Sequence, residues 1–414
     1  MLQQGILRFL FIGVLCSMFV TSGQGQSRCD FDERLPAIQQ SLILQQVLDI
    51  LAQSQGSLSL RSETTLPLVF HVVYRTDEEN ISDLQIRSQV DILNRDFAFA
   101  SDNLYKVPAA FQNLGGDSDI RFCLASTDPE GHPTSGITRT KTTSTHIGTH
   151  QEPNGRFSVN YDLYGGKNGW DPDRYINIWI ADMDGLLGTG TFPGMAPYPA
   201  EDGVIIDPEF VGAIGLAAGS YPFDKGHTLT HELGHYFGLF HIWGPGNGGC
   251  NVDDMIDDTP LQETPYLGCP DYPQYSCGSS DMFMNYMDFT NDRCLALFTR
   301  GQIQHMQTTL ATLRSGLLDN ADACAPPDSG KIDLDEALVF YAPGSHQVLI
   351  TLDKFSAETR EVMMFSMDGR LVYKSTWSDG SIYWIDANRL SAGIYVVQLQ
   401  TDSQRITRKV FITR

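Results

Sequence analysis

One eleven-residue segment, which runs from His231 to His241 and reads HELGHYFGLFH, constrains what this chain can fold into more than any other part of the sequence. On a helix, His231 and His235 lie one turn apart on the same face, so both imidazoles can reach one metal ion. Gly238 tolerates the positive φ angle that ends a helix and turns the chain. We therefore expect a helix and a turn that return His241 to the same ion as a third ligand.

The chemistry of these side chains favours a catalytic zinc. Three neutral imidazoles leave one coordination position open, whereas a structural zinc closes its coordination with thiolates. Glu232 follows His231 directly, and we expect it to act as general base toward water and then as proton donor to a leaving amine. His227, one turn earlier, is interpreted as a neighbour of the site or a solvated side chain, not as a ligand. The opposite helix face is predicted to enter the core through Leu229, Leu233 and Phe237.

Charge and the first residues indicate the compartment. The chain has 50 acidic and 28 basic side chains, a net charge of −22, which repels nucleic acid and anionic lipid, so we expect neither as a partner. Arg8 precedes an apolar stretch from Phe9 to Val20, which predicts a secretory signal peptide over residues 1–26. That stretch is shorter than a spanning helix needs, and we expect no transmembrane segment. A lipoprotein anchor at Cys16 is the alternative, although the small residue expected just ahead of a lipidated cysteine is missing.

Residues 27–61 are interpreted as a pro-segment. Apolar residues recur at helical spacing between Leu35 and Leu51, and Ser-, Gln- and Gly-rich sequence follows. The alternative is an N-terminal helix that packs on the main domain.

Residues 62–325 are predicted to form a mixed α/β domain. Strands are expected at residues 66–74, 120–124, 175–180 and 203–206. One helix is expected after Ser82 as N-cap, and a second, over residues 224–237, carries the histidines. This order of strands and helices indicates an α/β fold.

The last part of the chain has a different pattern. Residues 326–334 are predicted to be a linker, because they begin in Pro-, Ser- and Gly-rich sequence. Strands are then expected at residues 347–352, 361–367, 371–373, 393–400 and 406–412. Short strands at this spacing predict a small β-sandwich over residues 335–414.

The histidine motif, followed by NYMD at residues 285–288, resembles the metzincin clan, in which a methionine in a tight turn lies beneath the metal. Met287 matches that methionine. Within the clan the chain is most similar to the pappalysin family, through FHVVY at 70–74, NIW at 177–179, DDTP at 257–260 and the cysteines between 250 and 294. The resemblance covers residues 62–325. It implies a metzincin catalytic domain, with a twisted mixed sheet, an active-site helix and an irregular, disulfide-linked lower lobe.

The resemblance also implies bonds and surfaces. The family's disulfides, carried over by position, are Cys250–Cys277 and Cys269–Cys294, with Cys123–Cys324 as a possible third pair. Cys29 stays outside these pairs, and we hypothesise that its thiolate occupies the open position on zinc until the pro-segment is cleaved near Arg61. The Gly-rich segment with Gly188 and Thr189 corresponds to the upper rim of the cleft, where an extended substrate pairs with an edge strand.

An acidic loop follows the histidine helix. Its candidate calcium ligands are Asp253, Asp254, Asp257, Asp258, Thr259 and Glu263. Carboxylates at this density repel one another unless a hard cation lies among them, and pappalysin-like enzymes bind calcium in this loop. The alternative is a solvated acidic loop; a calcium ion there would be structural.

Two residues beyond Met287 are expected to shape the substrate pocket. Phe289 stands where the family has a tyrosine that hydrogen-bonds the tetrahedral intermediate, so that donor is missing. Arg293 lies where members that favour basic P1′ residues carry an acidic side chain, which predicts a shift toward acidic or neutral P1′ residues. Asp292 beside it could neutralise this charge. The alternative is that Arg293 points to solvent and the pocket is apolar.

The C-terminal part resembles the sorting domain of type IX secretion in Bacteroidetes, through Asp368-Gly369-Arg370, the LSAGIY run at 390–395 and the closing RKV at 408–410. The alternative is a carbohydrate-binding or adhesive sandwich. The resemblance implies a protein that uses the type IX secretion machinery and is released or attached to the outer surface of a Bacteroidetes-type cell.

These features predict a secreted zinc-dependent endopeptidase that acts on proteins or peptides, with water activated by Glu232. A catalytically inactive surface adhesin with a retained zinc site is the alternative from another class, and the intact Glu232 argues against it. A zinc hydrolase with a non-peptide substrate also fits the motif.

Overall fold

The computed structural model describes residues 29, 45, 47–50, 62–246, 248–324, 334, 337–342, 346–352, 360–377, 382–401 and 403–413. The predicted signal peptide lies outside the described residues, as does the predicted linker except for residue 334. Of the predicted pro-segment, residue 29 and helical residues between 45 and 50 are described. Each helix in the described parts of the chain is too short or too polar to cross a bilayer.

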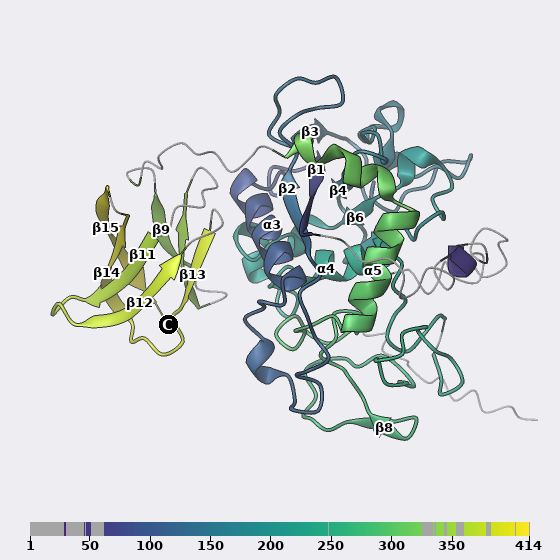
Figure 1. Ribbon diagram of the computed structural model, residues 1–414. Helices are drawn as coiled ribbons and strands as arrows, with labels where there is room; N and C mark the ends of the chain where they lie inside the picture. The colour runs from purple at the N-terminus through teal and green to yellow at the C-terminus, as the bar shows by residue number, and fades with distance from the viewer. Residues whose placement is uncertain are drawn as a thin grey trace, which may run out of the picture.

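A six-stranded sheet in the order β2-β1-β4-β6-β5 lies at the centre of the first domain, with β3 also paired to β1 (Figure 1). Its strands are β1 (Thr64–Tyr74), β2 (Ile120–Leu124), β3 (Ile137–Lys141), β4 (Ile176–Ile180), β5 (Gly188–Gly190) and β6 (Val204–Ile206). The first half of β1 pairs with β2 and the second half with β3, and β4 and β6 continue the parallel arrangement. Only β5 runs antiparallel to its neighbour β6, and it forms the edge.

The sequence of β1 explains why this sheet is covered on both faces. Residues Leu66 to Val73 are all buried, without alternation. Such a continuous run is typical of a parallel strand with packing on both sides. Phe70 faces the core that includes the helices, whereas Val73 packs with Trp179 on the opposite face.

Among the described residues, three α-helices accompany the sheet: α3 (Asp83–Phe97), α4 (His227–Tyr236) and α5 (Arg300–Thr312). Ser82 caps α3 as predicted, because its side chain accepts a hydrogen bond from the Gln85 amide. The core between helices and sheet contains the predicted apolar face of α4: Leu229, Leu233 and Phe237. Short 3-10 helices complete the domain: Leu104–Lys106, Ser158–Asn160, Asp162–Tyr164, Pro199–Glu201, Pro208–Phe210, Gly215–Gly219 and Ser315–Ala323.

Most predicted elements are present, with differences at their ends. The helix expected from residue 224 begins at His227, because Gly226 adopts a positive φ of 74° as its N-cap. The strands β3 and β5 and the helix α5 were not among the predicted elements. Helix α5 was missed because its buried face is rich in polar residues, among them Gln302, His305 and Thr309.

Between α4 and α5 the described chain contains no helix and only two short strands, β7 (Tyr275–Ser276) and β8 (Ser279–Ser280). The disulfides Cys250–Cys277 and Cys269–Cys294 both lie here, as the resemblance implied. A third bond, Cys123–Cys324, ties β2 to the end of the domain. This segment is the irregular lower lobe that the resemblance implied.

The C-terminal residues form the predicted β-sandwich. One sheet has the order β13-β10-β9 and the other β12-β11-β14-β15, all antiparallel. The strands are β9 (Leu338–Ala342), β10 (Gln347–Thr351), β11 (Arg360–Ser366), β12 (Leu371–Trp377), β13 (Ile382–Asp386), β14 (Gly393–Gln400) and β15 (Arg405–Ile412). Strands β9 and β13 were not predicted.

The outer face of the three-stranded sheet contacts the first domain beside α3 (Figure 1). Leu349 and Ile382 share an apolar cluster with Ile214, and the Arg95 guanidinium lies 4.1 Å from the ring centroid of Trp384. Because Val348 and Ile350 fill the sandwich core while Leu349 faces outward, β10 reads as a continuous apolar run.

Candidate metal centre

The structure brings the three predicted histidines together at the end of α4. The Nε2 atoms of His231, His235 and His241 lie 3.1–3.2 Å from one another, and all three side chains are fully buried. A tetrahedral zinc with Zn–N bonds of about 2.0–2.1 Å separates two nitrogen ligands by about 3.3–3.4 Å. The spacing and the donor set therefore fit one zinc ion.

Backbone carbonyls orient two of these imidazoles. Nδ1 of His231 donates to the Tyr286 carbonyl at 2.7 Å, and Nδ1 of His235 donates to the Leu239 carbonyl at 2.8 Å. A proton on Nδ1 leaves the Nε2 lone pair directed at the centre. Burial and the nearby His241 lower the pKa of His235 well below 6.5, so its ring is neutral, the form that binds a metal.

The turn after α4 depends on Gly238, as the sequence predicted. Its φ is 89°, which favours glycine. A Cβ there would also lie 2.9 Å from Oγ1 of Thr309 on α5. Beyond this turn His241 stacks on Trp243, with ring centroids 4.3 Å apart and planes at 17°. The turn and the stacked ring place the third imidazole beside the first two.

Met287 lies directly against α4, the helix that carries His231 and His235. A Cβ on Gly234 would be only 2.4 Å from the Met287 sulfur, so the glycine permits this contact. The Met287 amide donates to Oδ1 of Asn285 at 2.9 Å, and Asn285 exchanges two hydrogen bonds with Gln302 on α5. The methionine turn is thus fixed between two helices.

Cys29 is the fourth member of the cluster. Its sulfur and one ring nitrogen of each histidine all lie within 4.8 Å of one another, and no other such group of potential ligands occurs in the described part of the chain. The sulfur is 3.5 Å from Oε2 of Glu232, and the residue is 4% exposed. The backbone of Cys29 pairs in parallel with Gly188. Val47 of the predicted pro-segment belongs to the same apolar cluster as Cys29.

The edge strand β5 runs alongside Glu232. A Cβ on Gly188 would lie 3.0 Å from Cγ of Glu232, and one on Gly190 would lie 2.3 Å from its carbonyl oxygen. These glycines let the strand approach α4 closely. Thr189, between them, is buried. The outer side of β5 therefore offers backbone groups next to the metal centre.

The acidic loop is partly buried but does not gather around one point. Oδ1 of Asp254 accepts a hydrogen bond from Oγ1 of Thr259 at 2.7 Å, and burial, with the charges of Asp253 and Asp258, raises the pKa of Asp254 to about 8. Oδ2 of Asp258 accepts from the Gly301 amide at 2.9 Å, while its buried Oδ1 has no hydrogen-bond partner in the described residues. Asp257 and Glu263 do not join these carboxylates in a metal-binding group.

Phe289 and Arg293 lie in different surroundings. The Phe289 ring is 4.8 Å from that of His241 and 5.7 Å from that of His231, so it borders the centre. The Arg293 guanidinium pairs with the buried Asp224 at 3.1 Å and lies over the Tyr221 ring. Asp292 instead accepts from the Lys225 amide at 2.8 Å. The charge of Arg293 is therefore paired with that of Asp224.

Sequence reasoning missed one buried carboxylate near the centre, Asp96 on α3. It accepts hydrogen bonds from Thr230 and Tyr286, and Nε2 of His227 lies 3.6 Å away. His227 is buried, and its Nδ1 donates to the Asp292 carbonyl, so it neighbours the site rather than facing solvent. An acidic residue directly before Phe97, on the apolar side of α3, was the available signal.

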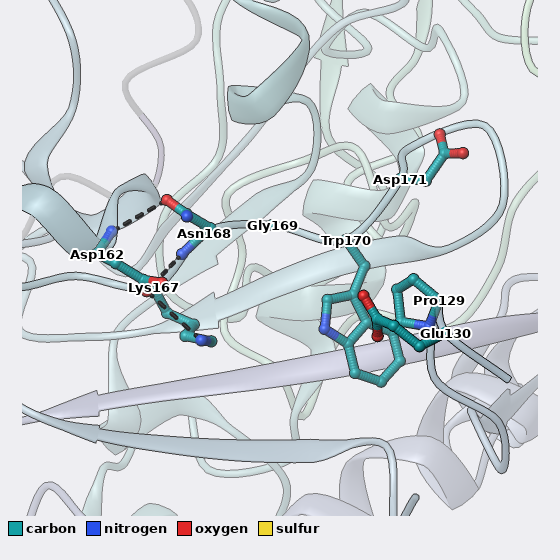
Figure 2. Close-up of a pocket in the computed structure, with 8 residues that line it drawn as sticks. All are labelled: Pro129, Glu130, Asp162, Lys167, Asn168, Gly169, Trp170 and Asp171. Atoms are coloured by element: carbon teal, nitrogen blue, oxygen red, sulfur yellow. Dashed lines mark hydrogen bonds and ion pairs between the residues drawn. The ribbon is translucent and has the colours of Figure 1, made fainter. Parts of the chain in front are cut away.

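A separate surface depression lies on the loops before β4 (Figure 2). Its lining is Pro129, Glu130, Asp162, Lys167, Asn168, Gly169, Trp170 and Asp171. Asp162 and Asn168 bond to each other's backbone amides, and Lys167 lies 3.5 Å from Asp162. None of the metal-centre residues lines this depression.

Comparisons with known proteins agree with this geometry. The peptidase family model described as pregnancy-associated plasma protein-A matches residues 162–311, and the secretion system C-terminal sorting domain matches residues 339–413. An extracellular metalloprotease of Arthroderma benhamiae is 30% identical over 283 residues, 66% of this chain and 81% of the relative. Another, from Arthroderma gypseum, is 31% identical over 60% of this chain and 73% of its own length.

Two solved structures from Tannerella forsythia are similar as well. A promirolysin mutant has a TM-score of 0.65 and 37% identity, and the match covers 72% of this chain and 100% of that one. Mature mirolysin in complex with a cleaved peptide has a TM-score of 0.59 and 40% identity, over 64% and 99% of the two chains.

The chain belongs to the pappalysin family of metallopeptidases. It is a secreted zinc metalloendopeptidase with a type IX sorting domain in its C-terminal part.

Proposed function

We propose that His231, His235 and His241 hold one catalytic zinc ion and that Glu232 is the general base of peptide-bond hydrolysis. The observation that carries this proposal is the convergence of three buried Nε2 atoms beside a buried carboxylate. Bound zinc would polarise the scissile carbonyl and lower the pKa of water to about 7. Glu232 takes the proton of the attacking water and passes it to the leaving nitrogen.

The substrate is proposed to bind as an extended strand along β5. An edge strand leaves backbone donors and acceptors unpaired, and a peptide that adds to it gains main-chain hydrogen bonds. The isolated parallel bridge between Cys29 and Gly188 supports this mode, because it is a backbone pairing at the edge of β5. The side chain of Phe289 offers no hydrogen-bond donor, so the developing oxyanion relies on the metal or on another donor.

We infer that Cys29 keeps the uncleaved chain latent. Its sulfur lies with the three imidazoles and beside Glu232, where it would occupy the open coordination position and displace the attacking water. On this proposal the signal peptide (1–26) and the pro-segment (27–61) are removed before activity appears. The mature enzyme would then comprise the catalytic domain (62–325), the linker (326–334) and the sandwich (335–414). If uncleaved Cys29→Ala protein hydrolyses substrate no faster than uncleaved wild type, this latency is absent.

A structural calcium ion at the acidic loop is a further proposal. Its support is the buried carboxylate of Asp254 together with the half-buried Asp258, whose Oδ1 atom is buried and lacks a hydrogen-bond partner among the described residues. Burial is hard to reconcile with a wholly solvated loop, because an unpaired buried carboxylate is costly. The loop contributions of Asp253, Asp257, Thr259 and Glu263 stay predictions. Calorimetric titration with Ca²⁺ tests the site, and an absence of binding heat at all accessible concentrations contradicts it.

For selectivity, we propose that Arg293 disfavours basic P1′ residues. Pairing with Asp224 weakens this effect but leaves two-fifths of the side chain exposed. Cleavage of a peptide library by wild type and by Arg293→Asp tests this proposal. If Arg293 borders the pocket, the variant gains cleavage before basic P1′ residues. Identical cleavage profiles would show that Arg293 does not border the pocket.

The export route is proposed to be the type IX machinery, which would recognise the sandwich and release the enzyme or attach it to the outer cell surface. Deletion of residues 335–414 should retain the enzyme inside the cell, and normal export of that truncated chain contradicts the proposal.

The activity itself is tested on the purified, cleaved enzyme with denatured protein as substrate. We expect hydrolysis, its loss with a zinc chelator and its return when zinc is restored. Hydrolysis unaffected by the chelator would contradict the metal's role, and absence of hydrolysis would favour the adhesin.

A further inference from the structure

A buried carboxylate on α3 serves no step of the proposed reaction. Asp96 is 4% exposed and lies at the end of α3, one residue before the helix stops. Its Oδ2 accepts a hydrogen bond from Oγ1 of Thr230 at 2.6 Å, and its Oδ1 accepts one from the Tyr286 phenol at 2.7 Å. One side chain thereby joins three separate elements: α3, α4 and the methionine turn.

The two hydroxyl donors flank the same zinc ligand. Thr230 immediately precedes His231 on α4. Tyr286 provides the backbone carbonyl that accepts the Nδ1 proton of His231 at 2.7 Å. The carboxylate of Asp96 therefore fixes both the helical turn that carries this imidazole and the acceptor that orients it.

We propose that Asp96 is a positioning residue for the zinc ligand His231. The proposal rests on the proposed function, because it takes His231 as a ligand. Groups that hold the acceptor of a metal-ligating histidine set the direction of its lone pair, and their loss typically costs 10- to 100-fold in metal affinity.

Physical chemistry argues against a purely space-filling role. A buried carboxylate loses its hydration, and replacement of buried charges by apolar residues of similar volume is often neutral or stabilising. Phe97, the next residue on the helix, packs its ring against Phe122 and Phe298, so apolar side chains are well accommodated in this part of the core. What only a carboxylate supplies here is acceptance of two hydrogen bonds in two fixed directions.

The same helix offers a matched control. Nε2 of Gln89 donates to the Gly226 carbonyl at 2.9 Å, and its Oε1 accepts from the Gly212 amide. Gln89 thus holds α3 against the start of α4, and neither of these two hydrogen bonds involves the turn that carries His231. Gln89→Met loosens the same helix interface without touching the carboxylate.

The test measures zinc affinity of the full chain by competition with a chromophoric chelator, and the visible spectrum of the Co²⁺-substituted protein. Asp96→Asn keeps the shape but replaces one acceptor oxygen with a donor NH₂, which cannot accept from Thr230 or Tyr286. We expect it to weaken zinc binding at least about 10-fold and to shift the cobalt bands.

Tyr286→Phe and Thr230→Val should each weaken zinc binding and shift the cobalt bands in the same direction, but less than Asp96→Asn. Gln89→Met should lower Tm and leave affinity and spectrum unchanged.

Wild-type affinity and an unchanged spectrum in Asp96→Asn overturn the proposal, as does an equal loss of affinity in Gln89→Met. If Asp96→Asn does not fold, Tyr286→Phe and Thr230→Val decide: two wild-type affinities reject the positioning role. A wild-type protein that binds no zinc overturns the proposed function instead, and the two failures are therefore distinct.

Discussion

The two sides of the metal centre are ordered by different means. On one side, α4 packs its apolar face into the main core against the central sheet, whose strands β1, β4 and β6 are buried and parallel. On the other, the chain between α4 and α5 has only two-residue strands among its described residues and is tied by Cys250–Cys277 and Cys269–Cys294. Core packing fixes the position of α4, which carries His231 and His235. Disulfides and local hydrogen bonds instead fix much of the segment between α4 and α5, on the other side of the metal centre.

This difference teaches where each part obtains its stability. A packed helix unfolds together with the whole domain, because its contacts are shared with the core. A cross-linked segment gains mainly from the restriction of its unfolded state, and it can lose order locally. The two sides should therefore respond differently to substitution, reduction and metal ions.

The largest effect is expected on the packed side. Leu233→Ala removes a fully buried side chain from the core and should lower the free energy of unfolding by about 2–5 kcal/mol. Denaturant unfolding followed by far-UV circular dichroism measures it. A loss below about 1 kcal/mol would show that the core does not hold α4.

A smaller and more local effect is expected on the cross-linked side. The bond Cys269–Cys294 closes a loop with a sequence separation of 25, for which the chain-entropy model gives about 3.5 kcal/mol. Replacement of both cysteines by serine should lower Tm and activity while the circular dichroism of the sheet and helices persists below the transition. If the circular dichroism of the double variant lacks the sheet and helix signal even below the transition, the two sides do not lose their structure independently.

The acidic loop should make stability depend on pH. Burial raises the pKa of Asp254 from 3.8 to about 8, so ionisation opposes folding. Its contribution to stability is complete below about pH 4 and is lost as the pH rises toward 8. Calcium should offset this loss, and Asp254→Asn should abolish both the pH slope and the calcium effect. Tm recorded between pH 5 and pH 9 with and without Ca²⁺ tests this. If the pH dependence of Tm persists in Asp254→Asn, another titratable group causes it.

The smallest effect is expected where the two sides meet. Phe289 comes from the cross-linked segment and contacts the ring of His241. Phe289→Tyr adds a phenolic donor and should leave kcat unchanged or raise it by up to about 10-fold. Steady-state kinetics on one peptide measure it. A large fall in kcat would show that the ring packs where a hydroxyl cannot fit.

The same contrast governs what the sequence could predict. The three histidines and Glu232 were readable because they lie within eleven residues on one helix and turn. Asp96 was not, because its partners Thr230 and Tyr286 are more than a hundred residues away and only the tertiary fold joins them. Pairing of the cysteines followed from the family resemblance, because loop spacing alone leaves several connectivities open.

Local rules also failed in identifiable ways. Helix α5 carries a capping box at Thr299 and Gln302, a signal that was present but obscured by the polar residues on its buried face. Strand β5 has only three residues, two of them glycine, and it is a strand because β6 lies beside it. Strands β9 and β13 pair with the two opposite edges of β10. Because β13 follows β10 only after two strands of the other sheet, its pairing could be seen only in the assembled sandwich.

The most direct test of the central claim is a paired measurement on Glu232→Ala and wild type, both cleaved and purified in the same way. Zinc content by atomic spectrometry and the rate of peptide hydrolysis are determined on the same samples. We expect one zinc per chain in both proteins and a rate at least about 100-fold lower in the variant, because the ligands remain and only proton transfer is lost. Loss of zinc from the variant, or hydrolysis at the wild-type rate, would contradict the role assigned to Glu232.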